Sequence, residues 1–226
     1  MEGASAVSAA TATPQTAASL RAGRAALSRY RGDGPLAQAL GALGRALPVA
    51  PAVVVAIGLA GLVVVAALEG DGASDAVVAA AIGAFVLLAG LTSGMPHTDR
   101  FAWAVPGLLR VGEYGGLVWV AANAGDSSHA AAFALIAALA FHHYDLVYRP
   151  RFQGVAPPTW VGLAAGGWDG RLVLACVFLL AGALPAAMFI LAGVLGATFA
   201  VECALSWARL SVSPLSVYED EEDEGQ

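Results

Sequence analysis

The feature that most constrains this chain is its series of long, uncharged, apolar segments. Residues 49–68 form 20 consecutive positions without a charged side chain, and residues 76–94 repeat the pattern over 19 positions. At about 1.5 Å per helical residue, roughly 20 residues cross the ~30 Å hydrocarbon core of a bilayer. Both segments therefore predict membrane-spanning helices.

Composition places the whole chain in the same class. Hydrophobic residues make up 58% of the 226 residues and charged residues only 12%, with a mean hydropathy of +0.72. Soluble domains carry about 25% charged residues, so a soluble fold of this composition would expose apolar surface everywhere. We predict an all-α, polytopic transmembrane helical bundle.

Four further spans are expected, which makes a six-helix transmembrane domain over residues 48–210. Residues 172–208 are too long for one crossing, and Gly182-Ala183-Leu184-Pro185 predicts a break between two helices. The four spans are residues 101–122, 130–148, about 168–183 and 185–208.

The remaining segments are predicted to be disordered or interfacial. Residues 1–17 are rich in Ala, Ser and Thr without periodicity, which predicts disorder. Residues 18–47 predict two amphipathic helices, divided at Gly32-Asp33-Gly34-Pro35, that lie on the membrane surface or form a soluble linker. Residues 211–226 form an acidic tail, for which we also predict disorder.

Arginine positions predict the orientation. All 11 basic residues are Arg, and all but Arg110 precede the first span or flank every second loop. The intervening loops at 69–75, 123–129 and 182–185 contain no arginine. The positive-inside rule then puts both termini in the cytoplasm, and the absence of Lys in an Ala- and Gly-rich chain indicates the codon bias of a high-GC genome. Six of the 17 acids lie in the tail, so the rest of the chain is neutral and no nucleic-acid partner is expected.

Polar residues inside or beside the spans are the candidate functional site, because charge near lipid is costly. The stretch from Phe141 to Arg149 holds two imidazoles, a carboxylate, two phenols and a guanidinium. The predicted topology brings this stretch to the same cytoplasmic half as polar residues of three other helices. The candidate polar or lipid-phosphate site comprises Arg110, Glu113, Tyr114, His142, His143, Asp145, Tyr148, Arg149, Trp168, Asp169, Arg171 and Glu202.

A purely structural interpretation of these residues stays open. Arg110 with Glu113, and Asp145 with Arg149, have spacings that allow neutralisation within one helix, and the aromatic residues suit an interfacial belt. Glu202 points more strongly to a site, because it needs a cation from another helix. Arg110 is the expected partner, because it lies at a similar predicted depth below the cytoplasmic surface of the membrane.

Metal binding is a further alternative. Adjacent histidines on a helix point about 100° apart, so His142 with Asp145 is the only pair of this stretch suited to one ion. The two cysteines, Cys176 and Cys203, fall in apolar runs without metal-binding spacing. No nucleophile elbow is present either. We predict no metal, no cofactor and no catalytic residue.

Four segments together resemble a known family. They are Asp33-Gly34-Pro35-Leu36-Ala37, Arg110-Val111-Gly112-Glu113-Tyr114-Gly115, the stretch from His142 to Arg149, and Gly167-Trp168-Asp169-Gly170-Arg171. The set resembles a bacterial membrane domain of unknown function (DUF5941) over about residues 30–210. In that family the domain often follows a CDP-alcohol phosphatidyltransferase domain, which implies a role near phospholipid-headgroup metabolism. The transferase signature itself is absent, since the nearest stretch, Asp71–Asp75, has the wrong aspartate spacing.

The favoured hypothesis is a non-catalytic membrane domain associated with phospholipid (CDP-alcohol) headgroup metabolism. Its expected partners are the bilayer, anionic phospholipid headgroups and a CDP-alcohol phosphatidyltransferase-type enzyme. Arg110, Arg149 and Arg171 would contact phosphate, because guanidinium suits bidentate phosphate binding.

The alternative hypothesis is a lipid-modifying membrane enzyme or a small transporter. It would use His142, Asp145 and Glu202 for proton transfer. A cavity that reaches both His142 and Glu202 would favour an enzyme, whereas a packed interior would favour a scaffold.

Overall fold

The computed structural model describes residues 29–96, 100–164 and 166–212. The predicted disorder of residues 1–17 and of residues 213–226 lies outside these ranges. Residues 211 and 212 were expected in the disordered tail but continue the last helix. No strand occurs in the part of the chain that the structure describes.

The described chain is a bundle of α-helices. A helix occupies each of the six ranges predicted to span the membrane, and Pro at the first turn begins three of the helices. The helices are α2 (Pro35–Gly44), α3 (Pro51–Glu69), α4 (Asp75–Leu91), α5 (Val105–Asn123), α6 (Ser127–Gln153), α7 (Thr159–Ala164), α8 (Gly167–Leu180) and α9 (Leu184–Val212), with 3-10 turns at Gly70–Gly72, Thr92–Gly94 and Ala102–Ala104.

Five stretches are long and apolar enough to cross a bilayer: α3, α4 with its following turn, α6, the α7–α8 stretch Thr159–Leu180, and α9. This is compatible with a multi-pass membrane protein. The sixth helix of the bundle, α5, is not among them, because Arg110 and Glu113 lower its mean hydropathy. The 14 residues of α8 alone extend about 21 Å at the helical rise, which is shorter than the ~30 Å hydrocarbon core. The stretch reaches 22 residues only when α7 is counted with α8.

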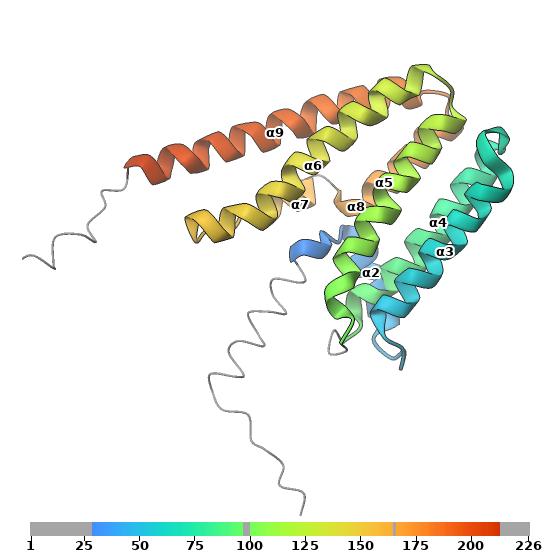
Figure 1. Cartoon of the computed structure of the whole chain (residues 1–226), viewed down its shortest axis with the longest axis horizontal. Coiled ribbons are helices and arrows are strands. Elements are labelled where there is room, and N and C mark those ends of the chain that lie inside the picture. Colours follow the sequence, from blue (N-terminus) through green and yellow to red (C-terminus); the bar gives the residue numbers. More distant parts are fainter. Residues whose placement is uncertain (1–28, 97–99, 165, 213–226) are drawn as a thin grey trace, which may run out of the picture.

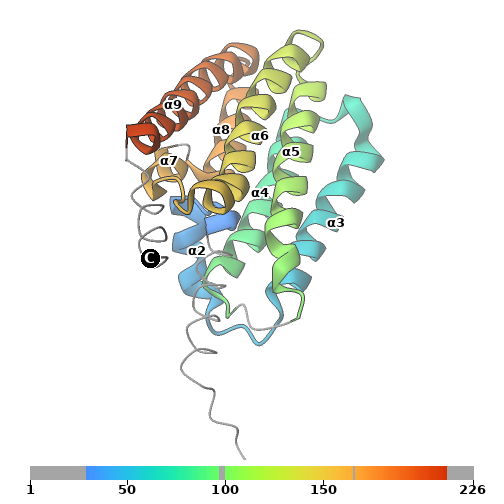
Figure 2. The ribbon, with the colours of Figure 1, turned by 60° about the vertical axis from the view of Figure 1, so that its left-hand side comes forward.

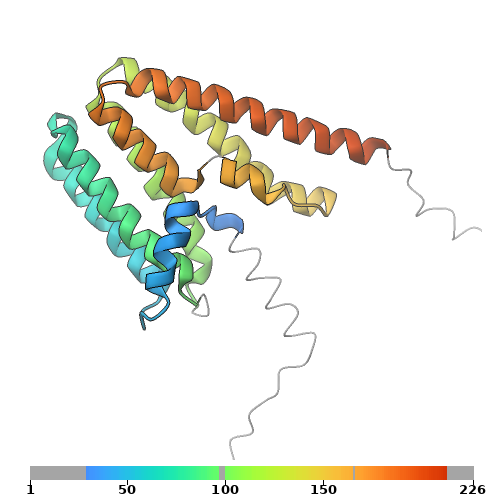
Figure 3. The same cartoon turned by 180° about the vertical axis from the view of Figure 1, so that it is seen from behind.

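The helices run up and down between two ends of the bundle (Figure 1). The turns after α3, α5 and α8 all lie at one end, and α2 and α7 lie at the other. The long helices α6 and α9 pack along each other (Figure 2). They diverge from the group formed by α3, α4 and α5 (Figure 1). Seen from behind, α2 and α7 lie in the opening between these two diverging groups of helices (Figure 3).

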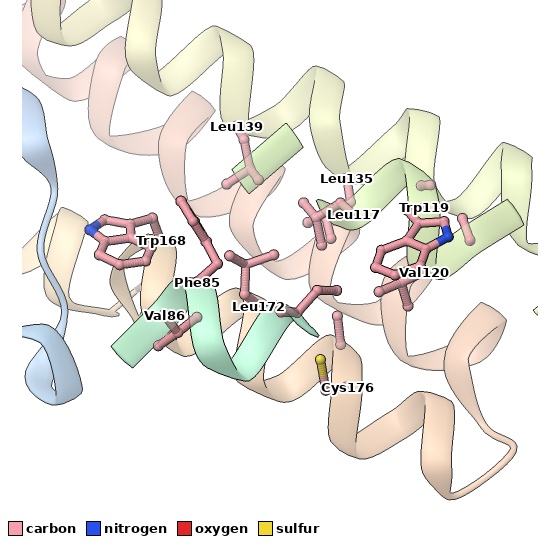
Figure 4. Close-up of a cluster of buried hydrophobic side chains, with 14 of the residues drawn as sticks. Phe85, Val86, Leu117, Trp119, Val120, Leu135, Leu139, Trp168, Leu172 and Cys176 are labelled. Carbon is pink, nitrogen blue, oxygen red and sulfur yellow. The ribbon is translucent and has the colours of Figure 1, made fainter. Parts of the chain in front are cut away.

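The core lies between α4, α5, α6 and α8 (Figure 4). Phe85 of α4 meets the buried Trp168 of α8 edge-on, with ring centroids 5.8 Å apart. Small residues allow close helix contact here. A Cβ on Gly112 would collide with the Phe85 ring, and one on Gly116 would lie 2.9 Å from Cδ2 of Leu172.

The amphipathic segment before the bundle is partly a helix that packs on protein. α2 contacts α4 and the turn Thr92–Gly94, and its buried face is Ala37, Gly41 and Gly44. A Cβ on Gly41 would lie 2.6 Å from the backbone nitrogen of Gly94. α2 docks on the bundle through this face of small residues. Its expected position on the membrane surface stays a prediction.

Candidate functional site

The carboxylate of Glu113 is the centre of an ionic cluster between α5 and α8. Its side chain is fully buried. Oε1 accepts a hydrogen bond from Nε of Arg171 at 2.6 Å, and Oε2 accepts one from Nη1 of Arg110. The expected pairing within α5 is therefore present, and an arginine from a second helix joins it. One carboxylate between two guanidiniums leaves this cluster positively charged.

Arg110 also ties the bundle to the segment before α2. Its Nη2 donates to the backbone carbonyl of Tyr30 at 3.2 Å and to that of Arg31. Residues 29–31 are helical and are followed by Gly32 in the left-handed conformation, with φ of 60°. Carbonyls at a helix C-terminus lack intrahelical donors, and a cation is favourable there. Arg110 thus caps one helix from the side of another.

Arg31 is buried in the same junction, although sequence reasoning did not include it in the site. Its Nε donates to Oδ2 of Asp33 at 2.7 Å, and its Nη2 donates to Oγ1 of Thr92 at 3.1 Å. The side chain is 2% exposed. The helix break directly after Arg31 was a signal that its side chain turns inward. Thr92, inside an apolar segment, carried no such signal.

Asp169 and Trp168 hold the N-terminus of α2. The Asp169 carboxylate accepts hydrogen bonds from the backbone amides of Gly34 at 2.6 Å and Ala37 at 2.9 Å. The N-cap of α2 makes no side-chain hydrogen bond of its own, so Asp169 satisfies these amides and complements the helix dipole. Nε1 of Trp168 donates to Oδ1 of Asp33 at 2.9 Å.

Two of the family-like segments touch through their backbones at this point. A Cβ on Gly34 would collide with the carbonyl of Gly166, and one on Gly167 would collide with the backbone of Gly34. Gly167 also has a φ of 67°, which disfavours side chains. Glycine is therefore required on both sides of the contact.

A second ionic cluster joins α6 to α9. Arg149 donates to Asp145 through Nε at 3.0 Å, and to both carboxylate oxygens of Glu202 at 2.8 and 2.7 Å. The Arg149 side chain is 1% exposed. The expected pairing of Glu202 with Arg110 is wrong. α9 packs along α6, which brings Arg149 to Glu202, whereas Arg110 faces Glu113 and the segment before α2.

The consecutive histidines of α6 face different neighbours, as their 100° separation predicts. The ring of His142 stacks on Phe199 of α9, with centroids 4.3 Å apart. Nδ1 of His143 lies 2.5 Å from the hydroxyl of Tyr114 on α5. Asp145, which the metal hypothesis paired with His142, pairs with Arg149 instead. Among the described residues, no group of three or more side chains is arranged to hold a metal ion.

Tyr148 lies apart from both ionic clusters. Its ring stacks on Tyr144 at 4.2 Å and on Phe152 at 6.1 Å between centroids, and all three rings are exposed. Exposed aromatic rings near a helix end suit the headgroup layer of a membrane. The exposed position of Tyr148 fits the interfacial belt that was the alternative interpretation.

A cavity of about 500 Å³ lies beside the first cluster, where the segment before α2 meets α6 and α7. Its polar wall includes Arg29, Asp33, His142, His143 and Arg171. Glu202 is not part of its lining. The cavity therefore reaches His142 but not Glu202, whereas the criterion for an enzyme required both.

The predicted single site is thus divided. Arg110, Glu113, Trp168, Asp169 and Arg171 form a continuous network around the N-terminal junction, with Tyr114 and His143 beside it. Asp145, Arg149 and Glu202 form the separate cluster between α6 and α9. Both lie toward the bundle end that carries α2 and α7.

No curated protein and no solved structure matches the sequence significantly. Residues 21–223 match the model of a family described as "Family of unknown function (DUF5941)". Because the match covers most of the chain, the protein belongs to this family of unknown function.

Proposed function

We propose that this protein is a non-catalytic domain of the bacterial plasma membrane that serves phospholipid-headgroup metabolism. Its α2–α7 end would face the cytoplasm and contact anionic headgroups. The observation that carries the proposal is the charge around the cavity. The network contains the arginines 31, 110 and 171 with the carboxylates Asp33, Glu113 and Asp169, and Arg29 lines the cavity beside it.

Four guanidiniums against three carboxylates leave this end of the bundle with an excess positive charge, and one carboxylate is already shared with the amides of α2. Among the three arginines first considered for phosphate contact, Arg171 has the most suitable position, because it lines the cavity. Arg110 is directed at backbone carbonyls, and Arg149 lies between two carboxylates. We assign phosphate contact to Arg171 together with Arg29.

The proposed protein partner is a CDP-alcohol phosphatidyltransferase-type enzyme. The support for it is the family resemblance, in which such a domain often precedes this one. The packing of residues 29–37 against α5 and α8 adds a physical reason: polypeptide that precedes α2 is held rigidly on the bundle. A transferase domain or subunit that docks on residues 29–37 would lie beside the cavity.

The test is purification of the full chain from native membranes, followed by lipid analysis and an assay for CDP-alcohol-dependent transfer in the eluate. We expect enrichment of anionic phospholipid over the bulk membrane, reduced by Arg29→Gln. Arg209→Gln, an exposed arginine at the far end of α9, is the matched control and should leave the enrichment unchanged. Bulk lipid composition in the wild type, together with no transferase activity, would refute the proposal.

A lipid-modifying enzyme is the second candidate. The observation in its favour is the presence of two imidazoles, His142 and His143, on the cavity wall. Against it, Asp145 and Glu202 are engaged with Arg149 rather than directed into the cavity. Incubation of the purified chain with labelled membrane lipid would produce a new lipid species only if this candidate is correct.

A further inference from the structure

We infer that the cavity between α6, α7 and the segment before α2 is a binding site for one phosphate group, with the imidazoles of His142 and His143 as hydrogen-bond donors. This inference rests on the proposed function and names the ligand chemistry of the same end of the molecule. The shared chemistry is a phosphate ester, and the structure favours a phospholipid as its source.

The first reason is the environment of His142. Its residue exposure is only 5%, and it lies on the cavity wall. Its ring stacks on Phe199 and borders the ring of His143, but it makes no hydrogen bond with any other described residue. Neither ring nitrogen is among the described side-chain atoms that are buried without a partner, so the imidazole stays accessible from the cavity. A phosphate oxygen in the cavity can accept a hydrogen bond from its N–H.

The second reason is the orientation of His143. Its Nδ1 faces the hydroxyl of Tyr114 at 2.5 Å. When this hydroxyl donates to Nδ1, the proton of the neutral imidazole lies on Nε2, so His143 becomes a second donor. Tyr114 is a positioning residue in this arrangement, because it selects the tautomer without lining the cavity.

The third reason is that the polar wall consists mostly of donors. Arg29 and Arg171 line the cavity together with the two histidines. The one carboxylate on the wall, Asp33, accepts hydrogen bonds from Arg31 and Trp168. A ligand rich in acceptors and negatively charged fits such a wall, and phosphate oxygens are strong acceptors for guanidinium and imidazole.

Apolar residues of the wall favour a lipid over a free phosphate compound. The lining also contains the apolar side chains of Leu146, Pro157, Pro158 and Leu163. Leu163 is 48% exposed on α7, so the apolar wall continues onto the outer surface of this helix. A phosphate beside His142 would thus leave an apolar path for acyl chains. A volume of about 500 Å³ lies within the range of ~300–1,000 Å³ typical of small-molecule sites.

The experiment uses two variants that change the cavity in different ways. His142→Phe keeps a ring to stack on Phe199 but removes both ring nitrogens. Gly162→Leu fills the cavity, since Gly162 lines it and a Cβ there would meet no atom within 4 Å. The matched controls are His129→Phe, an exposed histidine at the opposite end, and Gly61→Leu, where a Cβ likewise meets nothing within 4 Å.

Each full-length variant is reconstituted in nanodiscs of mixed phosphatidylglycerol and phosphatidylcholine, and the lipid retained after detergent extraction is counted by native mass spectrometry. We expect one tightly retained phospholipid in the wild type and in both controls, with retention weakened roughly tenfold or more in both cavity variants. Tyr114→Phe should weaken it less. Inorganic phosphate and glycerol phosphate are tested separately as ligands in water.

Saturable binding of glycerol phosphate with the same dependence on His142 would support the phosphate site. It would identify the ligand as a water-soluble phosphate ester instead of a lipid. Equal retention by the wild type, His142→Phe and Gly162→Leu would overturn the inference, as would a wild type that retains no phosphate compound. If anionic lipid stays enriched in the cavity variants, only this inference fails. If the wild type shows no enrichment and no transferase activity, the proposed function fails as well.

Discussion

The carboxylate of Asp169 accepts a hydrogen bond from the backbone amide of Gly34 at 2.6 Å, across 135 positions of the chain. This contact joins the start of α2 to the start of α8. It accounts for the aspartate that follows Trp168 in one family-like segment, and the close approach of the Gly166 backbone accounts for the glycine at position 34 in the other.

Removal of this cap should release α2. Asp169→Ala leaves the buried amides of Gly34 and Ala37 without an acceptor, which should cost about 1–3 kcal/mol. Asp169→Asn retains an acceptor oxygen and should cost less. Hydrogen exchange of residues 29–44 measures the effect directly. Unchanged protection in Asp169→Ala would mean that packing alone holds α2.

Removal of Glu113 should be among the most damaging single changes. Glu113→Ala removes the carboxylate that Arg110 and Arg171 share in a buried site, where loss of one ionic partner costs about 3–5 kcal/mol. The double variant Glu113→Ala/Arg171→Leu removes one of the two positive charges that bind this carboxylate and should recover part of the loss. Thermal unfolding in detergent micelles measures both, and a double variant less stable than the single one would contradict the ionic account.

The partner of Glu202 can be identified by double-mutant cycles. Arg149→Met with Glu202→Gln should show a coupling energy of about 1–3 kcal/mol, because the two side chains form two hydrogen bonds. Arg110→Met with Glu202→Gln should show almost none. A large coupling energy in the second cycle would support the pairing of Glu202 with Arg110, which was expected from their similar depth in the membrane.

Glycine at the contact of the two family-like segments should not tolerate a methyl group. Gly34→Ala places Cβ against the carbonyl of Gly166, and overpacking of this kind costs about 1–3 kcal/mol. Gly83→Ala is the control, since a Cβ there would meet nothing within 4 Å. Equal stability of the two variants would show that the backbone contact is looser than the structure has it.

The predicted orientation can be tested by cysteine labelling in intact cells. With Cys176 and Cys203 replaced by Ala, a membrane-impermeant thiol reagent should label Asp126→Cys from outside. Arg45→Cys should react only after the membrane is opened. The reverse pattern would place the α2–α7 end outside the cell and exclude a cytoplasmic partner at the cavity.

Much of the helical framework followed from local sequence. Runs of apolar residues located the six helices of the bundle within a few positions, since burial in lipid requires length and apolarity that a sequence displays directly. The pairing of Arg110 with Glu113 and that of Asp145 with Arg149 were also foreseen, because residues three and four apart on a helix are neighbours.

Only the tertiary structure decided which helices meet and which charges share a partner. Equal depth made Arg110 the expected partner of Glu202, but helices at equal depth can face any direction. The packing of α9 along α6 selected Arg149 instead. The sequence by itself determined how far each polar residue lies along its helix, because the helical rise is constant. The structure determined the two ionic clusters, the docking of α2 and the cavity beside His142, because these depend on helix rotation and on contacts between distant segments.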